Sequence, residues 1–129
     1  MTDVRIVLDG PAAVEPGSGI SGNVEWSLAS PASIIHVRLF WYTEGKGDRD
    51  LSVVEETDLP VSAATGRTPF RFRIPEGPYS FAGELISLIW AIEAIAEPSG
   101  STGREEITVG PGGRERRIGK DMLNEDLRT

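Results

Sequence analysis

The fold prediction depends on the stretch "GPYSFAGELISLIWAIEAIAEP", Gly77 to Pro98, because its apolar run fits two different elements. In a helix, its leucines and isoleucines would form a stripe at helical spacing, and its alanines and glutamates are good helix formers. In a strand, alternate residues from Ile86 to Ala96 would face one side of a sheet and their neighbours the other. Local periodicity alone leaves both interpretations open.

The segments around this stretch favour a strand. Turn signals separate them, and most alternate or are rich in β-branched and aromatic residues. They are "VRIVL" (4–8), "ISGNVEWSL" (20–28), "IIHVRLFWYT" (34–43), "LSVVEET" (51–57), "FRFRI" (70–74) and "REEITV" (104–109), with an irregular connector over 58–69. A lone central helix would leave these sheets without a partner, so we predict a strand over residues 84–97.

The strand count predicts an all-β fold, namely an immunoglobulin-like antiparallel β-sandwich of about seven strands in one domain over residues 1–109. Fifteen glycines and nine prolines in 129 residues suit a sandwich with many turns. A chain of this length can bury one core without disulfides. The pattern stops at "GPGG", and we expect residues 110–129 to form a flexible or short helical tail, because their apolar residues are few.

Composition argues against several classes of function. A net charge of −7 disfavours binding to nucleic acid, whose phosphates it would repel. The chain has no cysteine, which excludes thiolate nucleophiles and thiolate metal sites. Its one histidine, His36, is too few for a multi-histidine metal site and leaves little basis for a histidine-based triad. We therefore expect a protein without enzymatic activity and without a cofactor.

The N-terminus "MTDVRIVLDG" lacks the basic run and apolar region of a signal peptide, and no apolar run is long enough to span a bilayer. The absence of cysteine suits a reducing cytoplasm, although it also suits a bacterial exterior. We expect a cytoplasmic bacterial protein with no transmembrane segment.

Three stretches resemble the arrestin-type sandwich, the immunoglobulin-like fold shared by arrestins and Vps26-like proteins. They are "PGSGISGNVEW" (16–26), "IIHVRLFWYTEGKG" (34–47) and "FRFRIPEGPYSFAGELISLIWAIEA" (70–94). The third resembles the family's recurring Pro-Ser-aromatic-x-Gly lead-in to a strand that carries a tryptophan. The resemblance covers roughly residues 4–109 and implies a scaffold or adaptor, but no particular partner. Family members usually carry two sandwiches in tandem, and this chain has room for one.

The strongest predicted strand carries the candidate interface. Phe40 and Tyr42 share its second face with His36 and Arg38, so they predict an exposed apolar patch beside polar residues. Open strand edges offer a second means of protein recognition. We predict a protein-binding scaffold or adaptor domain of unknown partner, and self-association would replace the missing tandem domain.

The alternative is a carbohydrate- or calcium-binding sandwich module. It requires exposed tryptophans, whereas the strand patterns place Trp26, Trp41 and Trp90 in the core. It also requires a carboxylate loop that binds calcium, although the spacing here lacks the EF-hand order. The candidate carboxylates are Glu44, Asp48 and Asp50, with Glu55, Glu56 and Asp58 nearby. An enzyme with an unusual carboxylate site is a weaker third interpretation.

Overall fold

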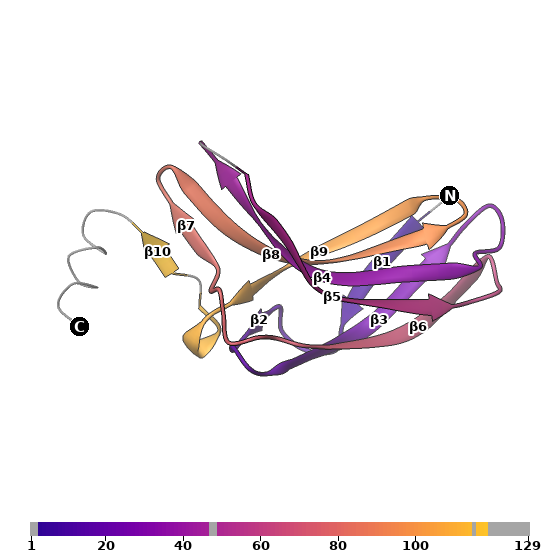
Figure 1. The fold of residues 1–129 in the computed structure, drawn as a ribbon. Helices are drawn as coiled ribbons and strands as arrows, with labels where there is room; N and C mark the ends of the chain where they lie inside the picture. The colour runs from indigo at the N-terminus through magenta and orange to yellow at the C-terminus, as the bar shows by residue number, and fades with distance from the viewer. Residues whose placement is uncertain (1–2, 47–48, 115, 119–129) are drawn as a thin grey trace.

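The structure is a computed structural model that describes residues 3–46, 49–114 and 116–118 (Figure 1). Strands make up most of this part of the chain. The strands are β1 Asp3–Leu8, β2 Ala13–Val14, β3 Gly19–Ser27, β4 Ile34–Gly45, β5 Leu51–Pro60, β6 Thr65–Arg73, β7 Phe81–Gly83, β8 Ile86–Glu97, β9 Ser101–Val109 and β10 Arg116–Ile118. A short 3-10 turn, η1 Pro111–Gly113, precedes β10.

The strands form two packed sheets. The small sheet has the order β1-β3-β6, and its pairs are antiparallel. The large sheet is built on β8, which pairs with β4 along its whole length, with β9 along its C-terminal part and with β7 near its start. Strand β5 continues this sheet beyond β4, and the short strands β2 and β10 add two parallel pairings. The all-β, immunoglobulin-like sandwich is confirmed, with seven described strands of six or more residues.

The core lies between the sheets. It takes every second residue of the long strands, as the two-residue period of a half-buried strand requires. The most deeply buried side chains are Trp90, Phe72, Ile35, Leu39, Ile74, Ile92, Val24, Val37, Val109 and Ser80. Trp26 and Trp90 are core residues, as predicted, and Trp41 packs against the core while partly buried.

The stretch Gly77–Pro98 is resolved as an extended lead-in, the short β7 and the long β8. Two polar contacts, one part-buried and one buried, hold the lead-in against the sheet. The indole Nε1 of Trp90 donates to the Pro78 carbonyl at 2.8 Å, and Ser80 Oγ accepts from the Val109 N–H at 2.9 Å. The Ser80 N–H also donates to the Val109 carbonyl. Thus the serine and tryptophan of the predicted motif hold the loop against β8 and β9.

Several element boundaries differ from the prediction. The connector predicted over 58–69 is mostly strand, because β5 continues to Pro60 and β6 begins at Thr65. This part of β6 alternates weakly in hydropathy, but it pairs with β3 from Ser27↔Thr65 onward. Strand β7 falls in a predicted loop, and β2 lies between two turn signals where no strand is predicted. Their two or three residues are too short to give a periodic signal.

The predicted tail begins with η1 and β10, and β10 lies beside β7. Residues 119–129 lie outside the described residues, so the prediction of a flexible or helical tail remains a prediction there. No helix in the described part of the chain has the length and apolar character needed to cross a membrane.

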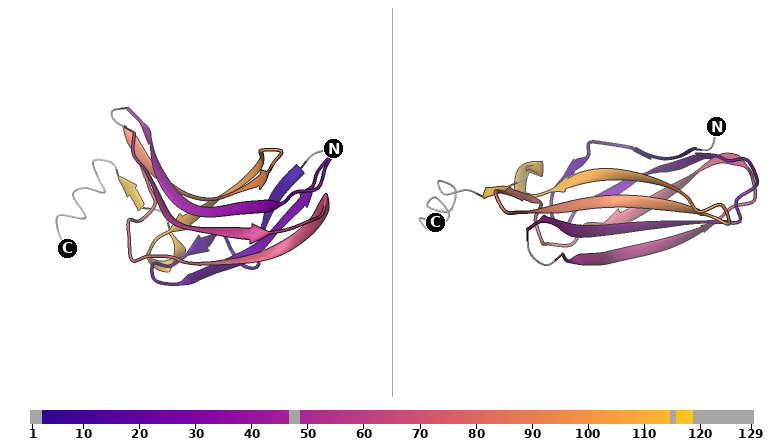
Figure 2. Two further views of the ribbon diagram at one scale, coloured as in Figure 1. Left: turned by 45° about the vertical axis from the view of Figure 1, so that its right-hand side comes forward. Right: turned by 90° about the horizontal axis from the view of Figure 1, so that it is seen from above.

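The two sheets are layered, and the long strands β4 and β8 bend along their length. The C-terminal end of β4 and the start of β8 rise away from the small sheet (Figure 2, left). The face of the large sheet that points away from the small sheet is not covered by any strand of the described residues, because the fold has only two layers there.

Candidate functional site

Strand β4 presents the four residues of the predicted interface on the uncovered face of the large sheet. Its other residues, such as Ile35, Val37 and Leu39, point into the core and are fully buried. Successive side chains of a strand alternate between faces, so His36, Arg38, Phe40 and Tyr42 point the other way. We call this side of β5, β4, β8 and β9 the outer face.

Strand pairing arranges the outer face in four rows of cross-strand neighbours. Two rows are apolar along β5, β4 and β8, and two contain charges. The rows are Leu51–Tyr42–Ile89, Val53–Phe40–Ala91–Glu106, Glu56–Arg38–Glu93–Arg104 and Asp58–His36–Ile95–Thr102. Side chains in one row are close enough to interact. The third row alternates in charge across four strands, so each internal member faces an opposite charge on both sides.

Glu93 holds the centre of the charged row. Its Oε1 accepts from Arg38 Nη2 at 2.6 Å and from Arg38 Nε at 3.1 Å, and its Oε2 accepts from Arg104 Nη2 at 3.1 Å. Its side chain is 12% exposed. Burial opposes ionisation of this carboxyl, but the hydrogen bonds from Arg38 and Arg104 outweigh it, so the pKa of Glu93 lies below its ordinary value. Glu93 is therefore ionised at neutral pH and forms ion pairs with Arg38 and Arg104.

Phe40 is buried, and its predicted exposure is wrong. The residue is 2% exposed, although it points away from the core between the sheets. Tyr42 stacks on its ring with centroids 5.9 Å apart. The guanidinium carbons of Arg38 and Arg104 lie 5.8 and 5.2 Å from the same ring centroid. A small apolar cluster thus lies on the outer face, covered by cations that favour aromatic faces.

A hollow of about 260 Å³ opens beside this cluster. Its walls combine both aromatic rings with charged groups of both signs. The lining residues are Phe40, Tyr42, Thr43, Glu44, Arg49, Asp50, Leu51 and Arg104. Thr43 fixes one wall, because its Oγ1 accepts from the Asp50 N–H at 2.8 Å. Of the predicted carboxylate loop, Glu44 and Asp50 line this hollow, while Asp48 lies outside the described residues.

Strand β5 forms an edge of the large sheet and pairs only with β4 in the part of the chain that the structure describes. Its first half is apolar and exposed. Leu51 is 66% exposed and Val53 is 41% exposed, and Val54 is exposed as well. Its second half carries Glu55, Glu56 and Asp58. A bulge separates the halves, because Leu39 pairs with Glu55 while Phe40 pairs with Val53.

His36 lies at the acidic end of the outer face. Its Nδ1 is 2.7 Å from Asp58 Oδ1. The hydrogen bond to Asp58 raises the pKa of His36, and the nearby charges of Glu56 and Glu97 act in the same direction. Ligand atoms of His36, Glu56 and Asp58 lie within 4.8 Å of one another, close enough to share one cation. Exposed carboxylates often lie this close without a metal, so this proximity alone does not define a metal site.

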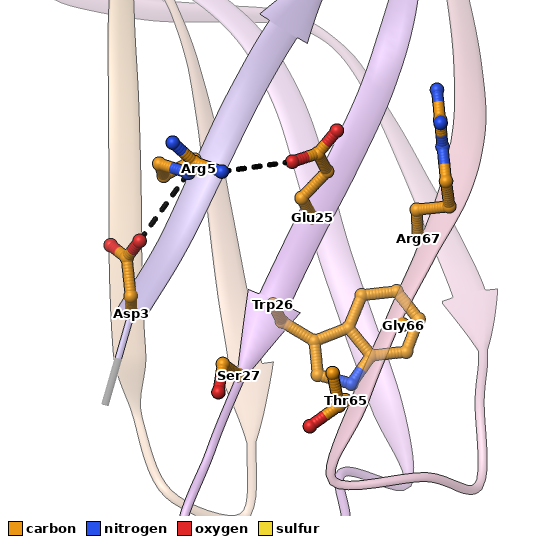
Figure 3. Close-up of a pocket in the computed structure, with 8 residues that line it drawn as sticks. All are labelled: Asp3, Arg5, Glu25, Trp26, Ser27, Thr65, Gly66 and Arg67. Atoms are coloured by element: carbon orange, nitrogen blue, oxygen red, sulfur yellow. Dashed lines mark hydrogen bonds and ion pairs between the residues drawn. The ribbon is translucent and has the colours of Figure 1, made fainter. Parts of the chain in front are cut away.

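A second hollow, of about 430 Å³, lies on the small sheet and was not predicted (Figure 3). Arg5 crosses it to form ion pairs with Glu25 at 3.0 Å and Asp3 at 3.4 Å. Trp26 borders it and occupies the space that a side chain at Gly66 would take, 2.8 Å from the Cβ position. Because Arg5 already has two carboxylate partners, this hollow offers a weaker recognition surface than the outer face.

Comparisons with known proteins identify a fold but no family. No protein-family model matches the chain, and no curated protein matches it. Among solved structures, it is similar to the sporulation control protein Spo0M from Bacillus subtilis, with a TM-score of 0.63 and 17% identity. That match covers 85% of this chain and 49% of Spo0M, so this chain spans about half the length of Spo0M. This similarity shows the fold alone.

Two further matches are weaker. A superoxide reductase (neelaredoxin) from Ignicoccus hospitalis has a TM-score of 0.48 and 16% identity, over 84% of this chain and 81% of that protein. A CARDB domain from Pyrococcus furiosus, solved in complex with di-metal ions, has a TM-score of 0.48 and 11% identity, over 84% of this chain and 88% of that domain.

Glu93 and Arg104 belong to the outer face, although the sequence patterns do not predict them there. A signal existed for Glu93, since it is the one charged residue inside the apolar run of β8. A charged residue at an otherwise buried strand position predicts a partner, and Arg38 is a suitable one. The partnership is set by β4–β8 pairing, which joins residues 55 positions apart and is not visible in local sequence. Arg71 and Arg73 lie on β6 of the small sheet, so they do not border the outer face.

Proposed function

We propose that this protein is a non-enzymatic scaffold or adaptor domain that binds another protein through the outer face and the β5 edge. One observation carries the proposal. Five large apolar residues are exposed in the described part of the chain, and three of them, Leu51, Val53 and Val54, lie together on an open strand edge beside the hollow at Tyr42. Open edges accept partner strands, and clustered exposed apolar residues are typical of interaction sites.

The same proposal includes the arrestin-type assignment, a cytoplasmic location and the absence of a role in nucleic-acid binding. The hydrogen bonds of Ser80 and Trp90 support the arrestin-type assignment, because these two residues belong to the stretch that resembles the family and they hold its loop against the sheet. The net charge of −7 supports the last point. Self-association through the same edge is the alternative form of protein binding.

Affinity capture with matched variants tests the proposal. Wild-type protein is used as bait in lysate of the native organism, beside V53E and V7E. Val7 of β1 and Val53 are equally exposed, at 40% and 41%, so V7E controls for loss of a surface valine and for added charge. We expect proteins retained by wild type and V7E but lost by V53E. If all three baits retain the same proteins, the β5 edge is not the binding surface.

The carbohydrate- or calcium-binding alternative has weaker support. Trp26 and Trp90 are buried and Trp41 is half-buried, which leaves no fully exposed tryptophan among these three to stack on a sugar. Calorimetry with calcium and with a panel of glycans tests it. Measurable heat that follows a binding curve would favour this alternative over the scaffold.

A further inference from the structure

We infer that the β5 edge accepts an extended partner segment whose outer-face side chains are basic beside Glu56 and Asp58 and apolar beside Leu51 and Val53. The inference rests on the proposed function and specifies the chemistry of the partner. It follows from the register of the outer face, since a strand added to β5 extends each existing row by one member.

The two charged rows end at β5 in negative charge. In the third row the sign alternates from Arg104 to Glu56, and the next position outward should therefore be positive. Arg38 is bonded to Glu93, and Glu56 forms no ion pair with the described residues. The fourth row ends at Asp58, which His36 neutralises only when the imidazole is protonated. Opposite charges placed directly across two strands stabilise their pairing.

The two apolar rows end at Leu51 and Val53. Both side chains are exposed on their free side, whereas Phe40 and Tyr42 pack on their other side through direct strand pairing. Side chains of an added strand would cover them, and the hollow beside Leu51 offers room for a larger apolar group. Charge on an edge strand hinders unwanted pairing, but this half of β5 lacks it.

The opposite side of β5 restricts the partner further. A hollow of about 480 Å³ opens there, lined by Glu55 together with Arg71 and Arg73 of β6. Arg71 and Arg73 outnumber Glu55 in this hollow, so basic side chains are less favoured on that side of an added strand than beside Glu56 and Asp58. The basic residues must therefore occupy alternate positions, all on the outer-face side. A shift by one residue would move them to the wrong side.

A second copy of β5 does not meet these requirements. Antiparallel pairing of two β5 strands would place acidic residues against acidic ones, or against Leu51 and Val53. Like charges directly opposite each other destabilise strand pairs. The occupant is therefore a segment of different sequence, with two basic and two apolar residues, each pair at alternate positions. In antiparallel pairing the basic pair comes first along the segment.

Fluorescence anisotropy with synthetic peptides and the full chain tests the inference. The first peptide carries two lysines and then two valines at these positions with threonine elsewhere, the second has its lysines shifted by one residue, and the third has glutamates in place of lysines. We expect the first to bind about tenfold more tightly than either other peptide. The double variant E56K/D58K should reverse the preference toward the glutamate peptide, whereas E105K on β9 should not. Hydrogen exchange should show new protection in β5.

Two results would overturn the inference. In the first, the three peptides bind equally, or E56K/D58K keeps the wild-type preference. In the second, sedimentation shows a dimer that dissociates in E56K/D58K, which would make a second copy the occupant. If captured proteins are lost with V53E but kept by E56K/D58K, the proposed function stands, and the inference that the partner carries basic residues beside Glu56 and Asp58 fails. If V53E loses nothing and no peptide binds, both fail.

Discussion

The guanidinium carbon of Arg104 lies 5.2 Å from the centroid of the Phe40 ring, on the outer face of the large sheet. The same arginine lies 5.6 Å from the Tyr42 centroid and donates to Glu93. Arg104 of β9 thus covers the two aromatic rings on β4 and also forms an ion pair with Glu93 on β8. This relationship explains why Phe40 is buried on a face that no other sheet covers.

Replacing Arg104 with alanine should uncover Phe40 and destabilise the fold. Loss of the cation–π contact and of one partly exposed ion pair should lower the free energy of unfolding by about 1–2 kcal/mol. Urea denaturation measures the change, and binding of an apolar dye reports the exposed ring. R104K keeps the charge but loses the planar group, so it should recover only part of the loss. Equal stability of R104A and wild type would show that Phe40 is buried without help from Arg104.

Replacing Glu93 with glutamine should lower stability by about 1–3 kcal/mol at neutral pH, because Arg38 and Arg104 are left close together without a counter-charge. The pKa of Glu93 is lowered in the folded state, so its contribution is complete above the ordinary glutamate pKa. It is lost as the pH falls through the lower folded value. Urea curves of wild type and E93Q from pH 7 to pH 3 should therefore converge at the acid end. A constant difference across this range would contradict the prediction.

The pKa of His36 should lie above its ordinary value of about 6.5 and should fall toward it in D58N. Because the chain has one histidine, an NMR titration of the imidazole follows this group alone. A raised folded pKa means that the interaction stabilises the fold below the ordinary value and is lost as the pH rises through the folded value. Wild type should therefore gain stability over H36Q on acidification from pH 8.5 to pH 5.5. An unchanged titration in D58N would exclude the Asp58 hydrogen bond as the cause.

Removing the hydroxyl of Ser80 should cost about 1–2 kcal/mol, because the buried Val109 N–H loses the acceptor at 2.9 Å. Thermal or chemical denaturation of S80A measures the loss. S27A, at an exposed position of β3, provides the control and should change stability by less than about 0.5 kcal/mol. Similar stability of the two variants would mean that water or a shifted loop replaces the hydroxyl.

Adding a methyl group at Gly103 should disturb the contact between β1 and β9. A Cβ atom there would lie 2.1 Å from the Val4 carbonyl oxygen, and backbone cannot move aside as a flexible side chain can. G103A should lower the free energy of unfolding by about 2 kcal/mol or more and weaken hydrogen-exchange protection in β1. G10A is the matched control, since nothing lies within 4 Å of its added atom. Normal protection of β1 in G103A would show that the strands separate easily.

The sequence predicts the inward residues better than the outward ones. Ile35, Val37 and Leu39 alternate with polar or aromatic neighbours, and their burial follows from strand period alone. For Phe40, strand period predicts the correct face but the wrong exposure. The residue that covers it, Arg104, is 64 positions away, and only the pairing of β9 with β8 brings it there. No periodicity within a single strand contains that information.

Residues 77–98 illustrate which features of the fold a local sequence pattern can predict. Together with its turn-separated neighbours, this stretch determined that the chain is a β-sandwich with Trp90 in its core, because burial of alternate residues is a property of each strand by itself. The tertiary structure alone decided that Glu93 lies between Arg38 and Arg104, and that β5 is the edge where the rows of the outer face end. The physical reason is that neighbours across a sheet are fixed by the order and register of strands, which depend on the packing of the whole chain.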